Sequence, residues 1–559
     1  MSLNFCDLFS EIKDGQTVLL EKEKEYHLWE EDAIRLTGYY ASNTASAAEN
    51  PDGFRRCAIF LKARKDITID GNGARLILHG IFTPFVFDRC ENLTVKNLTV
   101  EYARPTMSEY TVQSCDDGIC FLETEKSSSF YLDGNTLVWC GERGQDGRYY
   151  WENSYKNAKT LTMFYDPKTE RSQFCRSGEN DPRPSVPTFE RVERIGERTL
   201  KVVFKNREAC LPIGCVLQTR SIVRDQLGGL FVRCKDLSLE NLRICDMHGF
   251  GLLAQFCDGV VYRRLDCTPK AGKTVACNAD FFHFSGCKGR ILIEDCIASG
   301  AHDDFINVHG TYLRVVERCN AENAITVRFV HSESWGFQAF EKGDTIEFTV
   351  GGSYRALGTA EVLSFERLNN TDIKLYLSGS IPEELRLHED YVENVTATAS
   401  VEIRNNRFGP SMGRGMLCTT RKQVVVENNL FYKTGHAVLN IQNDTHGWFE
   451  SGTVGKFIFR NNQVIGCGYG LYGKNEPVVY FNPNVRKEDE ESAGEIYGEL
   501  TIENNRFEDA PNGEYEFYFG HTKCVVIRGN SFDREYKITA NKVGCLIEKD
   551  NEQKDGSKK

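Results

Sequence analysis

The chain has 559 residues, enough for a large hydrophobic core and for more than one domain. Hydrophobic residues make up 40% and charged residues 26% of it, as in soluble globular proteins. A formal net charge of −12 argues against a surface that follows nucleic-acid phosphates, and no apolar run approaches the roughly 18 residues of a membrane span. We therefore expect neither a nucleic-acid partner nor a membrane span.

The N-terminal segment, residues 1–16, is rich in charged side chains and has no long apolar stretch. It does not resemble a signal peptide, so we expect a cytoplasmic location, or secretion if a leader once preceded this sequence. Residues 1–102 are predicted to form an N-terminal cap and the first coils of a repeat.

The repeat consists of a short apolar strand, a polar corner and a further apolar position. Its shortest spacing is 23 residues, from 237 to 260 and from 401 to 424. Alternating strands with Asn at a fixed corner predict an all-β chain, a right-handed parallel β-helix. Asn tolerates a left-handed backbone at a bend, and its amide can bond to the Asn above and below, so we assign these residues a structural role. Copies of the unit occupy residues 93–98, 237–242, 291–296, 401–406, 424–429, 457–462, 500–505 and 525–530.

Two stretches, residues 103–227 and 311–400, lose the coil period and alternate as ordinary strands do. They are predicted to be small inserted β-barrel or sandwich domains. The coils that they separate are residues 228–310 and 401–547. The polar tail, residues 548–559, is predicted to be disordered.

The 21 cysteines are an odd number. Cys90, Cys234, Cys257 and Cys287 each stand three or four residues before an apolar strand. This recurrence indicates small buried hydrophobic side chains rather than disulfides, and it favours a reducing compartment. No CxxC pair occurs, so the spacing typical of a metal site is missing.

Asp280 and the pair Asp303-Asp304 are about one coil apart. On adjacent rungs, roughly 4.8 Å apart, Asp280 would lie beside Asp304 and share a proton with it, leaving one of the two ionised as a base. Asp303, offset by one position after the turn at 300–302, would act as a separate proton donor. Inverting glycoside hydrolysis requires such an arrangement, with acid and base about 6.5–9.5 Å apart.

Polar and aromatic residues near these carboxylates are candidates for binding a sugar, which needs hydrogen-bonding groups and an aromatic face. They are His302, Asn307, His309, Arg414, Asn440, Gln442, Trp448 and Glu450. We expect no cofactor and no metal. Two alternatives stay open for the acidic residues: a Ca²⁺ site built from carboxylate oxygens, and a purely structural turn.

The sequence resembles glycoside hydrolase family 110, the inverting exo-α-1,3-galactosidases, over roughly residues 15–535. The likeness rests on Asp280, on residues 303–310, and on the later segments 414–417 and 448–452. It implies Asp303 as general acid, Asp280 with Asp304 as base, and a substrate with terminal α-1,3-linked galactose, as on blood-group B or linear α-galactosyl glycans. It also implies an enzyme that can form a homodimer.

Two other readings remain. Polygalacturonases are also inverting β-helix enzymes, and Asn278-Ala279-Asp280, Asp303-Asp304 and His309-Gly310 imitate the order of their motifs. In that family, however, His-Gly lies about one coil beyond the Asp pair, and the Arg-x-Lys that binds a uronate is not evident here. The second reading, from a different class, is a non-catalytic β-helix that serves in adhesion or glycan binding.

Overall fold

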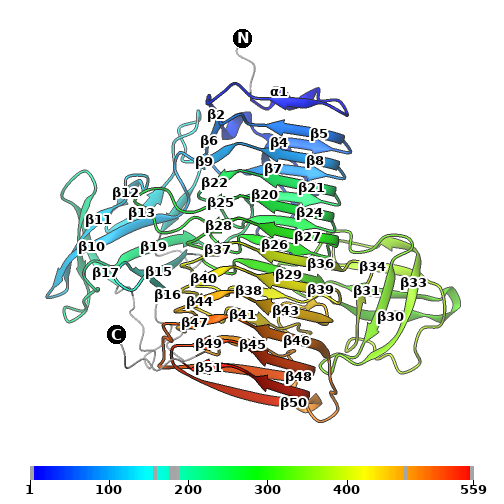
Figure 1. The fold of residues 1–559 in the computed structure, drawn as a ribbon. Coiled ribbons are helices and arrows are strands. Elements are labelled where there is room, and N and C mark those ends of the chain that lie inside the picture. The colour runs from blue at the N-terminus through cyan, green and yellow to red at the C-terminus, as the bar shows by residue number, and fades with distance from the viewer. Residues whose placement is uncertain (1–4, 155–159, 175–185, 187, 471–475, 554–559) are drawn as a thin grey trace.

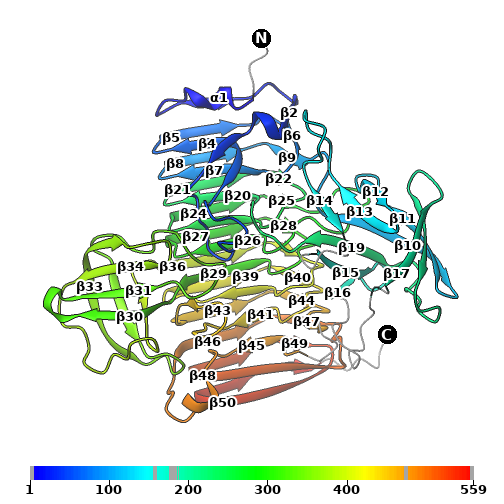
Figure 2. The same cartoon turned by 180° about the vertical axis from the view of Figure 1, so that it is seen from behind.

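The computed structural model describes residues 5–154, 160–174, 186, 188–470 and 476–553, and it is a parallel β-helix with two inserted domains. The coils stack from the N-terminus at one end to the C-terminus at the other, and the inserts project from opposite sides (Figures 1 and 2). A four-residue helix, α1 (Asp7–Ser10), lies at the N-terminal end. Within the described part of the chain, no helix is long and apolar enough to cross a membrane.

Each regular coil contributes one strand to each of three ladders. The first ladder, which carries the candidate site, contains β4 (Arg55–Lys62), β7 (Thr83–Asp88), β20 (Gly229–Val232), β23 (Leu252–Gln255), β26 (Phe282–Ser285), β29 (Ile306–Thr311), β38 (Met416–Cys418), β41 (Leu439–Ile441) and β45 (Val479–Phe481). The second contains β1 (Thr17–Leu19), β5 (Lys65–Asp70), β8 (Glu91–Lys96), β21 (Lys235–Glu240), β24 (Asp258–Arg263), β27 (Lys288–Glu294), β36 (Ala399–Arg404), β39 (Gln423–Glu427), β43 (Lys456–Arg460) and β46 (Tyr497–Glu503). The long strands β48 (Glu514–Arg528) and β50 (Glu535–Lys549) close the C-terminal end, and β48 pairs with both β45 and β46.

The third ladder contains β2 (Glu25–Trp29), β6 (Arg75–His79), β9 (Thr99–Tyr102), β22 (Arg243–Ile244), β25 (Asp266–Cys267), β28 (Ile297–Ala298), β37 (Arg407–Phe408), β40 (Leu430–Tyr432), β44 (Gln463–Ile465), β47 (Arg506–Glu508), β49 (Ser531–Phe532) and β51 (Glu552–Gln553). Apolar side chains from all three ladders point inward and form one continuous core. The parallel β-helix predicted from the repeat is therefore confirmed.

The paired asparagines at the corner of the C-terminal coils have different roles: the first forms the bend, and the second forms hydrogen bonds between coils. The first Asn of each pair, such as Asn405 and Asn461, has a left-handed backbone with φ of 59° and 55°. The second Asn is buried, and its amide donates to the Asn one coil further on at 2.9–3.1 Å. This ladder runs through Asn406, Asn429, Asn462, Asn505, Asn530 and Asn551.

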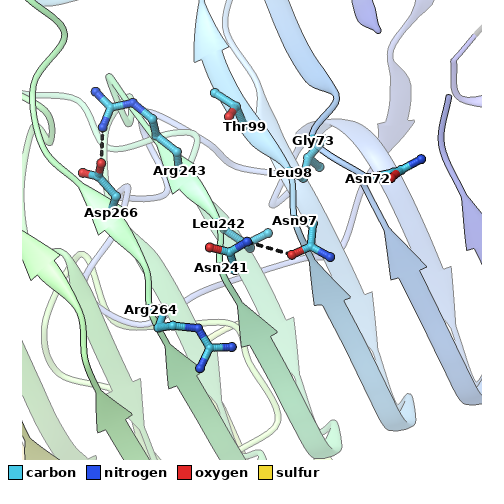
Figure 3. A pocket seen from close by; sticks show the side chains of 10 residues that line it. All are labelled: Asn72, Gly73, Asn97, Leu98, Thr99, Asn241, Leu242, Arg243, Arg264 and Asp266. Carbon is cyan, nitrogen blue, oxygen red and sulfur yellow. Dashed lines mark hydrogen bonds and ion pairs between the residues drawn. The ribbon is translucent and has the colours of Figure 1, made fainter. Parts of the chain in front are cut away.

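The same corner is built differently in the N-terminal coils. Asn97, Asn241 and Arg264 occupy the left-handed position, and Asn241 Nδ2 donates to Asn97 Oδ1 at 2.7 Å (Figure 3). The next residue is a buried leucine, Leu98 or Leu242, instead of Asn. A surface pocket of about 450 Å³ follows this corner, and none of the three candidate catalytic aspartates lines it. Packed leucines therefore replace the buried amide ladder here, and the amide bond lies at the left-handed position instead.

The cysteine column lies at another corner. Cys90, Cys234, Cys257 and Cys287 are free and buried, as expected, and three of their thiols contact a carbonyl oxygen of the neighbouring coil at 3.2–3.4 Å. The expectation of thiols does not hold everywhere, because Cys115 and Cys120 form a disulfide. These two residues face each other across the antiparallel pair β10 (Ser108–Asp116) and β11 (Ile119–Thr124), outside the coils.

The first insert is a pair of antiparallel sheets that share a core, not a closed barrel. The larger sheet contains β16 (Arg171–Phe174), β15 (Thr160–Asp166), β19 (Val216–Ser221), β10, β11, β18 (Thr199–Phe204) and β17 (Phe189–Arg194), and the smaller contains β12 (Phe130–Asp133), β13 (Thr136–Cys140) and β14 (Glu152–Ser154).

The second insert is a closed barrel with its own core. Its strands are β30 (Leu313–Cys319), β31 (Ala324–Arg328), β34 (Asp372–Leu377), β33 (Ala356–Arg367), β32 (Thr345–Thr349) and β35 (Tyr391–Asn394). It leaves the coil after β29, whose Gly310 and Thr311 also pair with β42 (Glu450–Ser451). The barrel chain therefore departs next to the candidate site.

The C-terminal tail is ordered further than predicted. Glu548 and Lys549 end β50, and β51 pairs with β49. Asn551 continues the buried ladder, because its Oδ1 accepts from the Asn530 backbone N–H at 3.0 Å. Disorder from residue 548 was thus the wrong prediction; residues 554–559 lie outside the described part of the chain.

The asparagine ladder gives a test of what holds the coils together. In Asn462→Ala, the backbone and side-chain N–H groups of Asn429, which donate to Asn462 Oδ1 at 2.9 and 3.0 Å, lose their acceptor. Each buried unsatisfied group costs about 1–3 kcal/mol, so the midpoint of thermal unfolding should fall by several degrees. Asn461→Gly, at the exposed left-handed neighbour, is the control and should change it little. Equal effects of the two variants would contradict this account.

Candidate active site

Parallel pairing places the three acidic residues and one arginine together. Phe282 of β26 pairs with Ile306 of β29, and Ile306 pairs with Met416 of β38. Two residues before each of these stand Asp280, Asp304 and Arg414. The backbone hydrogen bonds from Phe281 N to Asp304 O and from Phe305 N to Arg414 O extend the same register. The predicted stacking of Asp280 beside Asp304 is what the structure shows.

The carboxylates of Asp280, Asp303 and Asp304 each place one oxygen within 4.8 Å of the others. This is shorter than the predicted separation of about 6.5–9.5 Å between acid and base. The reason is geometric: adjacent rungs lie only about 4.8 Å apart. The distance alone therefore does not select an inverting reaction.

Two arginines neutralise part of this charge. Arg414 binds both oxygens of Asp304, at 2.6 Å each, and donates its backbone N–H to the same carboxylate. Arg224, between the first insert and β20, binds Asp303 Oδ2 at 3.2 Å. A cluster of three carboxylates could hold a divalent cation, but here guanidinium groups occupy two of them. A cation at this cluster would therefore compete with Arg224 for Asp303 and with Arg414 for Asp304.

Burial sets the ionisation of the stacked pair. Asp304 is fully buried and Asp280 is only 4% exposed. Burial raises the pKa of Asp280 to about 7, and the negative charge of Asp303 adds to this effect. Burial likewise raises the pKa of Asp304 to about 7, although Arg414 opposes it. Near neutral pH the pair therefore retains a proton, as two carboxylates in one site must.

Asp280 also begins a line of buried side chains behind the carboxylates. Its Oδ2 lies 2.8 Å from His283 Nδ1, and His283 Nε2 lies 2.8 Å from His309 Nε2. His309 Nε2 is 3.5 Å from Glu450 Oε1, and this oxygen also accepts from Asn307 Nδ2 at 3.2 Å.

Asn307, His309 and Glu450, which the sequence predicted to bind substrate, are at most 5% exposed. They bind one another, so they support Asp280 from behind rather than line an open pocket.

His302 does not reach the carboxylates. Its Nδ1 accepts from Arg220 Nε at 3.1 Å, and its Nε2 donates to Gln218 Oε1 at 2.9 Å. Burial, with the nearby Arg220, lowers the pKa of His302 well below its ordinary value, so the ring is neutral. Since both ring nitrogens are occupied, the prediction that His302 binds substrate was wrong; it fastens the first insert to the coil.

Trp448 supplies an exposed aromatic face. It is 38% exposed, its ring lies 4.1 Å from that of His331 of the second insert, and Arg224 approaches it at 5.9 Å. Arg224 thus links the aromatic face to Asp303. Asp444 accepts backbone N–H bonds from the turn that carries Trp448, including that of Trp448 itself at 2.9 Å. Asn440 on β41 and Gln442 after it are half-buried, further along the first ladder.

Several important residues were missed from the sequence. Arg224 and His331 belong to segments whose path depends on the inserts, and no motif marks them. Asn43, in an N-terminal segment, donates Nδ2 to Glu450 Oε1 at 2.6 Å. His283, by contrast, had a signal, because it stands three residues after Asp280 on the first strand of the motif.

A cluster of buried carboxylates with raised pKa values is what a glycoside hydrolase needs for acid and base catalysis. Comparison with known proteins gives the family. The alpha-1,3-galactosidase A of Bacteroides fragilis (strain YCH46) is 31% identical over 556 residues, covering 94% of this chain and 88% of that protein. The alpha-1,3-galactosidases A and B of Bacteroides thetaiotaomicron are 32% and 31% identical, over 88% and 84% of this chain and 82% and 74% of their own lengths. The chain belongs to this alpha-1,3-galactosidase family and is a galactosidase-type glycoside hydrolase.

One family model matches part of the chain, and one solved structure aligns with most of it. Residues 324–391, within the second insert, match the family model described as GLAA-B beta-barrel domain II. The exopolygalacturonase of Thermotoga maritima aligns over 97% of this chain and 95% of its own, at 9% identity and a TM-score of 0.34.

The burial of Asp280 predicts a pH-dependent cost. In the unfolded chain an Asp has a pKa of about 3.9, whereas burial raises the folded value to about 7. The folded state therefore binds more protons between these values, and its stability falls as pH rises through this window. At pH 8, Asp280→Asn, which stays neutral, should have a free energy of unfolding higher than that of the parent by an amount on the order of 1–3 kcal/mol. It should therefore unfold at a higher temperature. At pH 4 the gain should nearly vanish in calorimetry, and a gain that is constant with pH would contradict the account.

Proposed function

We propose that this protein removes terminal α-1,3-linked galactose from glycans with inversion of configuration and without a metal, as a member of glycoside hydrolase family 110. Linear α-galactosyl and blood-group B type glycans are the proposed substrates. The single observation that carries the proposal is the convergence of Asp280, Asp303 and Asp304, which each place one carboxylate oxygen within 4.8 Å of the others. The names of the relatives support galactose and the α-1,3 linkage.

Asp303 is the proposed general acid because it is the most accessible of the three. Its side chain is 36% exposed, and Arg224 orients one of its oxygens. It can therefore reach the glycosidic oxygen of a sugar that stacks near Trp448. Bond cleavage transfers the proton of Asp303 to the departing alcohol.

Asp280 and Asp304 are the proposed base pair that holds the attacking water. A water that bonds two oxygens at about 2.7 Å each can span up to roughly 5.4 Å. The observed spacing within 4.8 Å admits one such bridging water. The water oxygen forms a bond to the anomeric carbon, and its proton passes to the base pair.

Replacement of Asp303 tests the acid. Asp303→Asn should reduce kcat on an α-1,3-linked galactobiose by ~10² to 10⁴, the range of general acid catalysis. A 4-nitrophenyl α-galactoside needs little protonation of its leaving group, so its loss should be much smaller. Asp304→Asn is the comparison and should impair both substrates alike, because the attacking water is needed in each case. Equal losses for Asp303→Asn on both substrates would assign the acid elsewhere.

The linkage and the stereochemistry can be read in one experiment. Galactosides with α-1,3, α-1,4 and α-1,6 linkages, with and without a branching fucose, are digested and followed by proton NMR from the first minutes. We expect the α-1,3 linkage to be cut fastest, β-galactose to appear before mutarotation, and a chelator to change nothing. Initial α-galactose would reverse the stereochemical proposal, and loss of activity with the chelator would reinstate the cation alternative.

A further inference from the structure

The line from Asp280 to Glu450 has a hydrogen-bond pattern that fixes where its protons are. All its members are buried: the side chains of His283 and His309 are 0% and 1% exposed, and those of Asp280 and Glu450 are 6% exposed. His309 Nδ1 lies 2.5 Å from the Gly310 carbonyl oxygen, which can only accept. His309 Nδ1 therefore carries a proton. This proton determines which atoms of His283 and Asp280 donate and which accept.

A neutral His309 with its proton on Nδ1 leaves Nε2 as an acceptor. Nε2 faces His283 Nε2 at 2.8 Å, so His283 must donate there. A neutral His283 then has an acceptor at Nδ1, and Asp280 Oδ2, at 2.8 Å, must donate to it as a carboxylic acid. In this first arrangement Asp280 is protonated, and both imidazoles are neutral.

A second arrangement holds the same number of protons. If Asp280 gives its proton to His283 Nδ1, and His283 passes its Nε2 proton to His309 Nε2, Asp280 becomes a carboxylate and His309 an imidazolium. The hydrogen bonds between Asp280 and His283 and between His283 and His309 persist with their directions reversed. The bond from His309 Nδ1 to the Gly310 carbonyl oxygen is unchanged. The line can therefore exchange a neutral acid for an ionised base without releasing a proton to solvent.

A carboxylate lies beside the His309 end of the line. Glu450 Oε1, 3.5 Å from His309 Nε2, accepts from the amides of Asn43 and Asn307, so it stays an acceptor. Charges that face the other end are Asp303, Asp304, Arg224 and Arg414. Both arginines favour an ionised Asp280. Asp304 opposes it, and so does Asp303 whenever it is ionised, but not in the form that carries the proton it donates as general acid. The ring of Phe250, packed on His283 at 5.0 Å, is apolar and leaves this balance to the charged groups.

We propose that Asp280, His283 and His309 form a proton relay that makes Asp280 a base by moving its proton to His309. The proposal rests on the hydrolytic function proposed above. In the step, the water oxygen bonds to the anomeric carbon, the glycosidic bond breaks, and the water proton is taken up by the Asp280 carboxylate. Asp303 supplies the proton of the leaving alcohol. The line then holds one proton more than at rest, so Asp280 releases a proton to solvent as His309 returns its own through His283, and Asp303 takes up a proton from solvent. His283 and His309 touch no substrate and are positioning residues.

The pH profile of kcat/KM separates a relay from a merely structural role. In His309→Gln the amide oxygen can still accept from His283, but it cannot take a proton. Asp280 must then lose its proton outright, so the acid limb of the profile should move up by about one pH unit. We expect a loss approaching tenfold at pH 6, less than about threefold at pH 9, and a KM within about twofold of the parent. Glu450→Gln should move the limb in the same direction by less, and it also serves if His309→Gln does not fold.

His248 provides the matched control. It is also a buried histidine paired with an aspartate, since its Nε2 lies 3.1 Å from Asp225 Oδ1, but it lies outside the relay. His248→Gln should leave the acid limb where it is, whatever it does to stability. An unmoved limb in both His309→Gln and Glu450→Gln would overturn the relay.

A second measurement needs no substrate. In protein labelled with ¹⁵N-histidine, the relay requires neutral His309 to carry its proton on Nδ1 and neutral His283 on Nε2. Long-range ¹H–¹⁵N spectra distinguish these forms, with His309→Gln and a His283→Gln variant to assign the signals. Finding His309 protonated on Nε2 alone would overturn the relay even if galactosides are cleaved. The expected forms in a protein that cleaves no galactoside would instead reject the proposed function and retain the hydrogen-bond line.

Discussion

The register of the first ladder is the constraint on which the site depends. Because β26, β29 and β38 pair without a shift, Asp280, Asp304 and Arg414 fall in one column. A slip of one residue in any of these strands would turn its side chains to the opposite face and break up the cluster. Successive rungs of the column carry an aspartate, an aspartate and an arginine. The positive charge of the arginine therefore offsets the repulsion between the two carboxylates, which lie about one rung apart.

The inserts complete a site that the coils only begin. The first insert returns to the coil through Arg224, which binds Asp303, and through Gln218 and Arg220, which hold His302. The second contributes His331, which packs on Trp448. Arg224 from the first insert thus binds one of the three carboxylates directly. Burial raises the pKa of Asp280 and of Asp304, and the charge of Arg224 opposes that rise at Asp280, so the first insert also shapes the chemistry of the site.

The sequence was sufficient for the repeat and for the stacked acids, because both follow from local spacing. A gap of one coil between Asp280 and Asp304 needs no knowledge of the rest of the chain. The same spacing did not reveal that only the second Asn of each pair builds the buried ladder, since both residues fit a bend equally well. Arg224 could not be found, because its position depends on how the whole first insert folds back. His302 was misassigned for the same reason: Gln218 and Arg220 are some 80 residues away in the chain.

The short distance between the carboxylates is a consequence of the fold and bears on the chemistry. Side chains on a β-helix sit on a lattice with about 4.8 Å between rungs and about 3.3 Å between residues, so an acid offset by one residue from a base on the next rung starts only about 5.8 Å from it. The backbone of a β-helix therefore already brings the two catalytic carboxylates closer together than the separation that marks inverting glycosidases in other folds. Close carboxylates share protons, and a base within such a group needs another place for its proton. The buried line through His283 and His309, which begins at Asp280 Oδ2, offers that place.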